Sequence, residues 1–189
     1  NGTLDASFAP QISHFPGFVT GVSAIDIQAD GRILVGGNFA FVNGVTHLYL
    51  ARLNQDGSVD ASFTPSFSYH VTSIKVQRDQ DILVGGLFET VNGETHNRIV
   101  RLNPDGSVDS AFTASFGSEV LAIAIDDDDN LYFGGYGFVR RYSLSGIRDA
   151  AFLPTINERV ETILLQPDGK IVIGGRFWIV NGQSHLYVA

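Results

Sequence analysis

The 189-residue sequence contains neither cysteine nor methionine. Without cysteine it can form no disulfide, and thiolate catalysis and Cys-ligated zinc are excluded together. Because even an initiator methionine is absent, we expect a piece of a longer protein or a mature product. The longest uninterrupted apolar run is six residues, at 120–125. A membrane helix needs ~20 such residues, so we expect no membrane insertion.

Positive charge is scarce as well. Twelve Lys and Arg face twenty Asp and Glu, which gives a formal net charge of −8. This balance disfavours a sequence-independent grip on phosphate backbones, so nucleic acid is not an expected partner. Apolar residues make up 44% of the chain, enough for the core of one folded domain.

An eight-residue block recurs along the chain. It reads DGSVDASF at 56–63, DGSVDSAF at 105–112, SGIRDAAF at 145–152 and NGTLDASF at 1–8. A Gly-Gly pair also closes an apolar run four times, at 36–37, 85–86, 134–135 and 174–175. Such self-similarity at a period of about 40 to 50 residues indicates a repeat architecture.

A third motif is present in three of the four units. After the Gly-Gly pair comes an Asn-Gly loop followed by a histidine, and the third unit lacks this loop. The motif residues are Asn43 with His47, Asn92 with His96, and Asn181 with His185. We therefore interpret residues 1–189 as a single domain or segment of four units, approximately 9–63, 64–112, 113–152, and 153–189 completed by 1–8.

Each unit has the pattern of four short strands. The first is β-branched with period-two alternation, as at 71–76, and an Asp-Gly turn follows it. The second strand, as at 82–84, is apolar on successive residues, which predicts burial on both faces. A third strand (48–53 or 99–102) leads through a second Gly turn to a short fourth strand ending at Phe63 or Phe112.

No stretch has helical periodicity free of Gly or Pro, so the predicted fold class is all-β. Four-stranded antiparallel units in tandem are typical of the blades of a β-propeller. Two arrangements remain open: a ring whose first strand completes its last blade, or an excerpt of a longer array. If the ring is open, we expect self-association by the pairing of half-rings.

The motifs resemble the delta-60 repeat, a domain of unknown function classed as a β-propeller. The resemblance is carried by ILVGG at 82–86, Val91-Asn92-Gly93 and RLNPDGSVD at 101–109. Similar repeats occur in large secreted or surface bacterial proteins, so the resemblance implies an extracellular or cell-surface location. It supplies no catalytic residues. The third unit departs from the pattern, with Ser145 in place of the turn aspartate.

Irregularity between the units collects on one side of the predicted sheets. The link from the block's Phe to the next first-strand Ile takes 17 residues in unit one (Phe8 to Ile25) but 11 in the others. Loops on a rigid scaffold commonly carry function, so the candidate ligand-binding residues are those of this side. They are His14, Phe15, Phe18, Tyr69, His70, Glu119, Glu158, Arg159 and Trp178.

Metal and cofactor sites are not predicted. His47, His96 and His185 would be separated by blade widths, whereas ligand nitrogens lie ~2.0–2.1 Å from one ion. We expect each to bond within its own loop. The acidic run at 126–129 lacks the spacing of an EF-hand, so a solvated turn is favoured over a cation site. No nucleophile–base pair or poised carboxylate pair is evident, and no catalytic residue is predicted.

The favoured interpretation is a non-enzymatic scaffold or binding module of a larger secreted or cell-surface protein, with a protein or glycan ligand. The alternative is a glycan-binding lectin or glycan-active enzyme with its site at the central opening.

Overall fold

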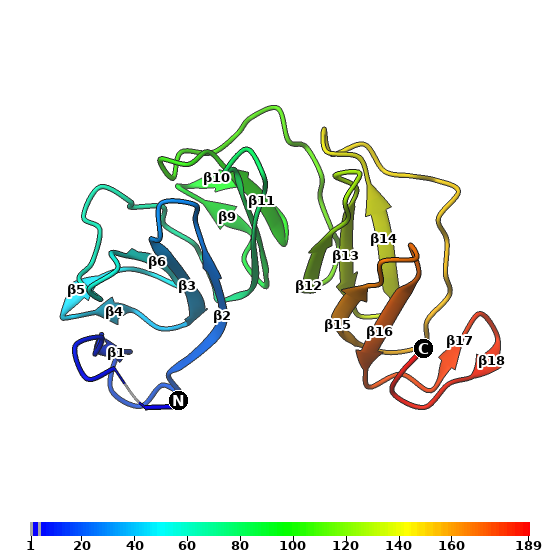
Figure 1. Ribbon diagram of the computed structural model, residues 1–189, viewed down its shortest axis with the longest axis horizontal. Helices are drawn as coiled ribbons and strands as arrows, with labels where there is room; N and C mark the ends of the chain where they lie inside the picture. The colour runs from blue at the N-terminus through cyan, green and yellow to red at the C-terminus, as the bar shows by residue number, and fades with distance from the viewer. Residues whose placement is uncertain (1, 4) are drawn as a thin grey trace.

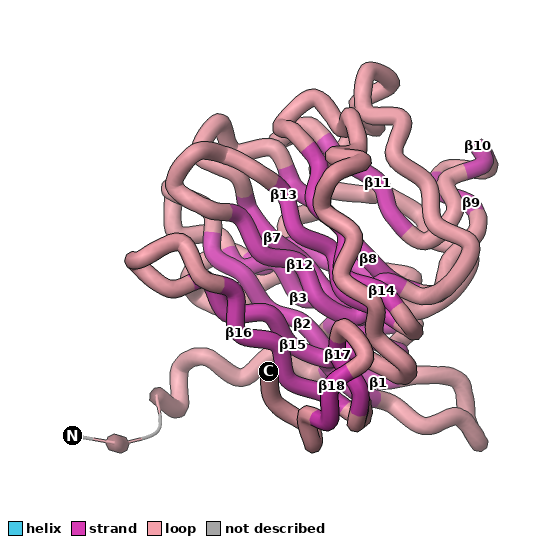
Figure 2. The backbone as a smooth tube through the Cα atoms, turned by 90° about the vertical axis from the view of Figure 1, so that its right-hand side faces the viewer, coloured by secondary structure: helices cyan, strands magenta, loops and turns pink. Residues whose placement is uncertain are grey.

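The computed structural model describes residues 2–3 and 5–189, and every regular element in these ranges is a β-strand. The described residues include no helix of the length and apolar character needed to cross a membrane. Four sheets follow one another along an open arc, and the chain ends lie at the two ends of the arc (Figure 1). In the side view, the antiparallel strands of these sheets lie along roughly the same axis, with loops at both ends (Figure 2). The all-β prediction is confirmed.

Each of the first three units contributes a three-stranded antiparallel sheet. The strands are β2 (Gly21–Ile27), β3 (Ile33–Asn38) and β6 (Leu50–Leu53) in unit one, β7 (Val71–Val76), β8 (Ile82–Gly86) and β11 (Ile99–Leu102) in unit two, and β12 (Val120–Ile125), β13 (Leu131–Gly135) and β14 (Phe138–Tyr142) in unit three. Unit four pairs β15 (Val160–Leu165) with β16 (Ile171–Gly175), and Val188 bridges to Gly174 where a third strand would run.

The middle strand of each sheet is the most deeply buried, as predicted from its unbroken apolar run. All five residues of β8 and of β13 are buried, and so are the four central residues of β3. The last of these strands, β16, is only partly buried. Burial on both faces therefore depends on a covering layer on each side, and for β3 these layers are unit two and the N-terminal residues Phe8 and Ile12.

The predicted fourth strand is reduced to one bridge in each of the first three units. The bridges are Leu53 with Val59, Leu102 with Val108, and Tyr142 with Arg148. The chain leaves the sheet directly afterwards because the next residue is an aspartate that starts a turn. In unit one, the Asp60 carboxylate accepts the backbone N–H of Ser62, and its carbonyl accepts that of Phe63. The sheets thus have three strands and a bridge rather than the four strands predicted.

The Asn-Gly loops form small hairpins in the three units that contain the motif. They are β4 (Phe41–Val42) with β5 (Val45–Thr46), β9 (Thr90–Val91) with β10 (Glu94–Thr95), and β17 (Ile179–Val180) with β18 (Gln183–Ser184). Asn43 has φ 50° and Gly44 φ 77°, which Asn and Gly tolerate. The Asn43 side chain accepts the N–H of Gln11, next to β1 (Ile12–Ser13), which pairs with β4. Each hairpin is thereby tied to the link that enters its unit.

Neighbouring units pack through the first glycine of each Gly-Gly pair. A Cβ on Gly36 would lie 2.5 Å from Val71 Cγ1 and 2.8 Å from Ile74 Cδ1 of the next unit. Val120 and Ile123 contact Gly85 in the same way. The glycines are therefore required because the next unit's strand occupies the space of a side chain.

A buried arginine joins adjacent units on the side of the Asp-Gly turns. Arg101 Nε donates to Asp109 Oδ2 at 2.7 Å within unit two, and its Nη1 donates to the carbonyl of Leu144 in unit three at 2.6 Å. The guanidinium also lies over the ring of Phe112, 4.9 Å from its centroid. The same arrangement recurs in unit one, with Arg52 in place of Arg101 and Asp60 in place of Asp109. The arginine side chain thus forms hydrogen bonds both within its own unit and to the next unit.

The first strands of all four units face a shared space. A cavity of about 310 Å³ is lined by residues of β2, β7, β12 and β15, including Ile25, Ile74, Ile123 and Ile163. Successive first strands also contact each other, β2 with β7, β7 with β12, and β12 with β15. This common axis is the arrangement of a β-propeller, here open on one side.

Candidate functional site

Two sides of the arc can be distinguished. The turn side carries the Asp-Gly turns, and the loop side carries the starts of the first strands and the small hairpins. On the loop side, one repeat position immediately precedes the Val of each first strand, and it holds Gly21, His70, Glu119 and Arg159 in successive units. The second glycine of each Gly-Gly pair lies against the backbone here, since a Cβ on Gly86 would be 2.4 Å from the carbonyl oxygen of His70. The glycines thus fix the backbone of this position.

Polar side chains at this position meet across the units. His70 Nε2 lies 3.5 Å from Glu119 Oε1, and Arg159 Nη2 lies 3.8 Å from Glu119 Oε2. Only 16% of the Glu119 side chain is exposed, whereas Arg159 is 42% exposed. A single carboxylate therefore links units two, three and four around the axis. The Glu119 carboxylate is the centre of this polar group, with Arg159 open to solvent.

Aromatic rings continue the polar group into unit one. The Tyr69 ring lies 4.6 Å from that of His70 and 6.0 Å from that of Tyr49, measured between centroids. The Tyr49 ring lies 6.4 Å from that of His14, which in turn stacks on Phe18 at 4.8 Å. Burial raises the pKa of Tyr49, and Tyr69 raises it further.

Together these contacts form a continuous chain across all four units, which we call the loop-side row. Phe15 joins it through His14, at 5.5 Å, and anchors it on Phe41 at 5.0 Å. Three of the aromatic side chains are about half exposed or more: Phe15, Phe18 and Tyr69. The members of the row are His14, Phe15, Phe18, Tyr49, Tyr69, His70, Glu119 and Arg159.

A surface hollow adjoins the row at Tyr69. It has a volume of about 410 Å³ and is lined by Ser68, Tyr69, Leu87, Glu89 and Arg98. Arg98 Nη2 donates to Glu89 Oε1 at 2.9 Å, so an ion pair and Tyr69 line the same hollow. The hollow thus combines an aromatic face with charged hydrogen-bonding groups.

Two residues predicted from the sequence stand apart from the row. The ring and ion-pair contacts of the described residues include neither Glu158 nor Trp178. Trp178 is 49% exposed, and its backbone N–H donates to the side chain of Asn157. The carbonyl of Glu158 accepts the N–H of Gly137, a structural bond to the neighbouring unit. Both remain predictions as ligand-binding residues.

Tyr49 is a member of the row that the sequence analysis missed. It follows the Asn-Gly loop and has φ 68°, as does Tyr187 at the same position of unit four. A non-glycine residue with positive φ is uncommon, and it directs the side chain away from the strand path. The recurrence of Tyr at this position in units one and four was the available signal.

The acidic run at 126–129, on the turn side, forms hydrogen bonds within its own turn. Asp126 accepts the backbone N–H groups of Asp128 and Asn130, and the side chains of Asn130 and Tyr132 also donate to it. Burial alone would raise the pKa of Asp126, but these hydrogen bonds lower it. Arg78 of unit two pairs with Asp127 at 3.3 Å.

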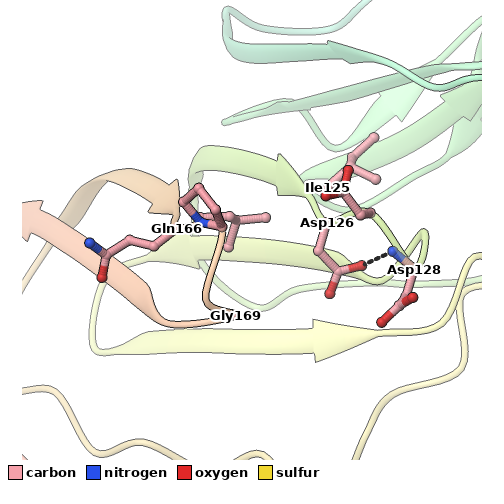
Figure 3. A pocket seen from close by; sticks show the side chains of 8 residues that line it. Ile125, Asp126, Asp128, Gln166 and Gly169 are labelled. Atoms are coloured by element: carbon pink, nitrogen blue, oxygen red, sulfur yellow. Dashed lines mark hydrogen bonds between the residues drawn. The ribbon is translucent and has the colours of Figure 1, made fainter.

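The same aspartates line a hollow of about 370 Å³ between units three and four, shown in Figure 3, in which Asp126 bonds Asp128 across the turn. The carboxylates of Asp126 and Asp127 are thus engaged in turn and ion-pair contacts. The described residues hold no group of three His, Cys, Asp or Glu side chains that could bind a metal ion.

The three motif histidines close their loops through the backbone. The N–H groups of His47, His96 and His185 donate to the carbonyls of Ala40, Glu89 and Trp178. Burial lowers the pKa of His47. The imidazole Nε2 of His96 is buried without a partner among the described residues, so the bond to the loop comes from the main chain.

The chain was compared with known protein families. The family model described as "Domain of unknown function (DUF5122) beta-propeller" matches residues 28–63, 77–112 and 166–189, which together are just over half of the chain. The chain belongs to this family. The third unit of this DUF5122 chain, at 113–152, lacks the Asn-Gly loop and lies wholly outside the matched ranges. The sequence matches no curated protein.

Solved structures with a similar fold cover most of the chain. They include the extracellular domain of the one component system BT4673 from B. thetaiotaomicron (17% identity, TM-score 0.54, 82% of this chain and 20% of that chain). Streptogramin B lyase matches at 14% identity and TM-score 0.53 (89% and 54%). PorZ, a surface component of the type-IX secretion system of Porphyromonas gingivalis, matches at 15% and 0.51 (86% and 26%). The chain spans about a fifth to a half of these structures, and the likeness concerns the fold.

Proposed function

We propose that this chain is a non-enzymatic binding module that recognises a ligand through the loop-side row. The observation that supports it is the unbroken series of contacts from Phe18 in unit one to Arg159 in unit four. Units two to four supply His70, Glu119 and Arg159 at one repeat position, and unit one supplies aromatic rings from its link and from Tyr49. The row therefore offers stacking faces at one end and ionisable groups at the other. Loops on a rigid scaffold commonly serve such roles.

A glycan is the ligand that this combination suits best. The half-exposed faces of Tyr69 and Phe18 can stack on the apolar face of a sugar ring, as aromatic side chains do in recognition sites. Arg98 and Glu89 beside Tyr69 supply a donor and an acceptor for hydroxyl groups. A peptide would be the competing protein-type ligand, and it serves as the comparison in the test.

Binding is favoured over glycan cleavage because of the carboxylates. Glycoside hydrolysis commonly uses a pair of carboxylic acids on either side of the bond to be broken. The row contains one, Glu119, and that group is engaged by His70 and Arg159. A glycan-active enzyme remains the alternative, and turnover of a bound oligosaccharide would establish it.

The setting we propose is a larger secreted or cell-surface bacterial protein built from delta-60-type repeats. Two of the similar structures support this setting, since one is described as an extracellular domain and another as a bacterial surface component. Residues 1–189 would form one propeller segment within that protein, with the loop side turned toward its ligand.

The test is a titration of the chain with panels of oligosaccharides and peptides, followed by isothermal calorimetry. We expect saturable binding of an oligosaccharide, and a loss of at least about tenfold in affinity for Tyr69→Ala and for Glu119→Gln. Ile147→Ala is the matched control, because Ile147 is exposed on the turn side. Equal affinities for all four proteins, or no saturable binding in either panel, would contradict the proposal.

A further inference from the structure

Two positively charged side chains of unit three have no carboxylate partner. Of the twelve Lys and Arg residues of the chain, ten lie within 3.8 Å of a carboxylate oxygen. Among the described residues, Arg140 and Arg148 form no such pair. The formal net charge of the chain is −8, so carboxylates are in excess. The absence of a partner for these two arginines therefore sets unit three apart.

Both arginines replace apolar residues of the other units. Arg140 lies on β14 at the position that Ala51 and Val100 hold in units one and two, where both are buried. Arg148 holds the fourth-strand bridge position, which is a valine in units one and two. Those two valines pack against the cores of their own units. Unit three thus has a positive charge at two positions where the repeat otherwise has apolar packing.

The two arginines lie on one face of the unit-three sheet. Tyr142 and Arg148 are directly opposite each other in an antiparallel bridge, so their side chains share a face. Arg140 precedes Tyr142 by two residues on β14 and therefore belongs to the same face. Diagonal neighbours of this kind are ~7–8 Å apart. We call Arg140 and Arg148 the arginine pair.

Aromatic rings hold the guanidinium of Arg140. Its Cζ lies 4.9 Å from the ring centroid of Phe138 and 5.3 Å from that of Phe116. These two rings are buried and stack on each other at 5.2 Å. Within the described residues, no group accepts a hydrogen bond from the Arg140 side chain. The guanidinium is therefore fixed in place with its N–H donors free, which reduces the entropy lost when it binds an anion.

The arginine pair can be reached from solvent. Arg148 is exposed and lines a hollow of about 420 Å³, and Arg140 is partly exposed. Strand β14 is the edge strand of its sheet, and its bridge to Arg148 is at its last residue, Tyr142. A short turn at Tyr136 and Gly137 joins β13 to β14 in place of the Asn-Gly hairpin of the other units. A segment of another molecule can thus approach both side chains.

We propose that the arginine pair binds an acidic segment of a partner polypeptide, in extended conformation and with carboxylates at alternate residues. A guanidinium donates two parallel N–H bonds to one carboxylate, which makes such a pair strong and specific. Residues two apart in an extended chain are separated by ~6.6 Å. This spacing is close to that of the arginine pair, so one segment can place a carboxylate on each arginine.

This site is separate from the loop-side row and does not rest on the function proposed for it. The rings below Arg140 are those of Phe116 and Phe138, and neither is a member of the row. The negative charge of the rest of the chain also disfavours binding of an acidic segment elsewhere on the surface. The arginine pair therefore directs such a segment to unit three.

The experiment is fluorescence anisotropy of a short labelled peptide in which glutamate and threonine alternate. We expect saturable binding of this peptide, and none of a peptide with glutamine in place of every glutamate. A sulfated oligosaccharide is titrated in parallel. Binding of that oligosaccharide at the arginine pair without binding of the acidic peptide would overturn the proposal, and so would the absence of saturable peptide binding.

Variants assign the binding to the arginine pair. Arg140→Val and Arg148→Val introduce the residue that unit two has at each position, and each should weaken peptide binding at least about tenfold while the circular dichroism spectrum is kept. Arg140→Lys retains the charge but not the planar fork, so its affinity should be intermediate. Arg78→Ala, which removes an exposed arginine that already has a partner, is the matched control. This control and Tyr69→Ala in the row should leave peptide binding unchanged. Wild-type affinity in both valine variants, or an equal loss in Arg78→Ala, would overturn the proposal.

Discussion

The turn side and the loop side of this chain are built from the same repeats but use them differently. On the turn side, equivalent positions carry the same residue types, and each Asp pairs with the Arg of its own unit, as Asp60 does with Arg52, Asp109 with Arg101, and Asp149 with Arg141. On the loop side, one position holds His70, Glu119 and Arg159, and these side chains contact each other across units.

The Arg–Asp pairs of the turn side stabilise the units, whereas the side chains of the loop side vary from unit to unit. Identical side chains repeat where every unit needs the same internal bond. The loop side takes its geometry from glycines such as Gly86 and from hydrogen bonds to the backbone, such as that from the Ser66 N–H to the Asn92 side chain. Its side chains are therefore released from a structural role, which allows each unit to contribute a different chemical group.

The largest expected effect comes from removing a turn-side arginine. Arg101→Ala leaves the Asp109 carboxylate without its cation and the Leu144 carbonyl without its donor. Breaking a buried pair by removing one partner costs about 3–5 kcal/mol, so we expect a loss of that size in the free energy of unfolding. Urea denaturation followed by tryptophan fluorescence measures it.

The control for this substitution is Arg78→Ala on the same side. Arg78 is 61% exposed and pairs with Asp127 at the surface, so its removal should change the free energy of unfolding by less than about 1 kcal/mol. Equal losses for the two variants would show that burial of the arginine does not matter, which contradicts the structural role assigned to the turn side.

A smaller effect is expected from acid. Burial opposes ionisation of Asp60, but hydrogen bonds from Ser62, Arg52 and Arg32 outweigh it and hold the pKa far below 3.8. A carboxyl whose pKa is lower in the folded state adds stability that is complete above its unfolded pKa and is lost progressively as the pH falls from that value towards the folded pKa. We expect the free energy of unfolding to decline below about pH 4, and less steeply in Asp60→Asn. Parallel pH profiles of the two proteins would contradict this role of Asp60.

The smallest effect on stability is expected on the loop side. Tyr69 is 48% exposed, and its contacts are with His70 and Tyr49 in the row. Tyr69→Ala should lower the free energy of unfolding by no more than about 1 kcal/mol, as measured by urea denaturation. A loss as large as that of Arg101→Ala would mean that the row stabilises the fold rather than remaining free for a ligand.

The sequence predicted the repeats, the buried second strands and the crowding at the Gly-Gly pairs, because these follow from spacing and residue type alone. Seven of the eight members of the row are among the residues predicted from the links between units. Tyr49 could not be assigned this way, since its place depends on a positive φ after the Asn-Gly hairpin. Contacts between equivalent positions, such as that of Glu119 with Arg159, depend on the angle between units, which no local pattern specifies.

The fourth strand was predicted from the sequence but does not form as a full strand. Its alternating residues, Val59 and Val108, indicate a strand, yet only one bridge forms in each unit. The aspartate that follows turns the chain by accepting backbone N–H groups two residues on, and it binds the arginine of the third strand. Local side-chain bonds therefore override the strand pattern.

One pair of variants tests the division between the two sides most directly. Glu119→Gln removes one negative charge from the loop side, and Asp109→Asn removes one from the turn side. The two carboxylates are exposed to a similar extent, 16% and 17%. Measured together by thermal unfolding and by calorimetric titration with the oligosaccharide bound by the wild type, the first should lose binding and keep its melting temperature. The second should lose melting temperature and keep binding. The reverse assignment, or the loss of both properties in both variants, would contradict the account.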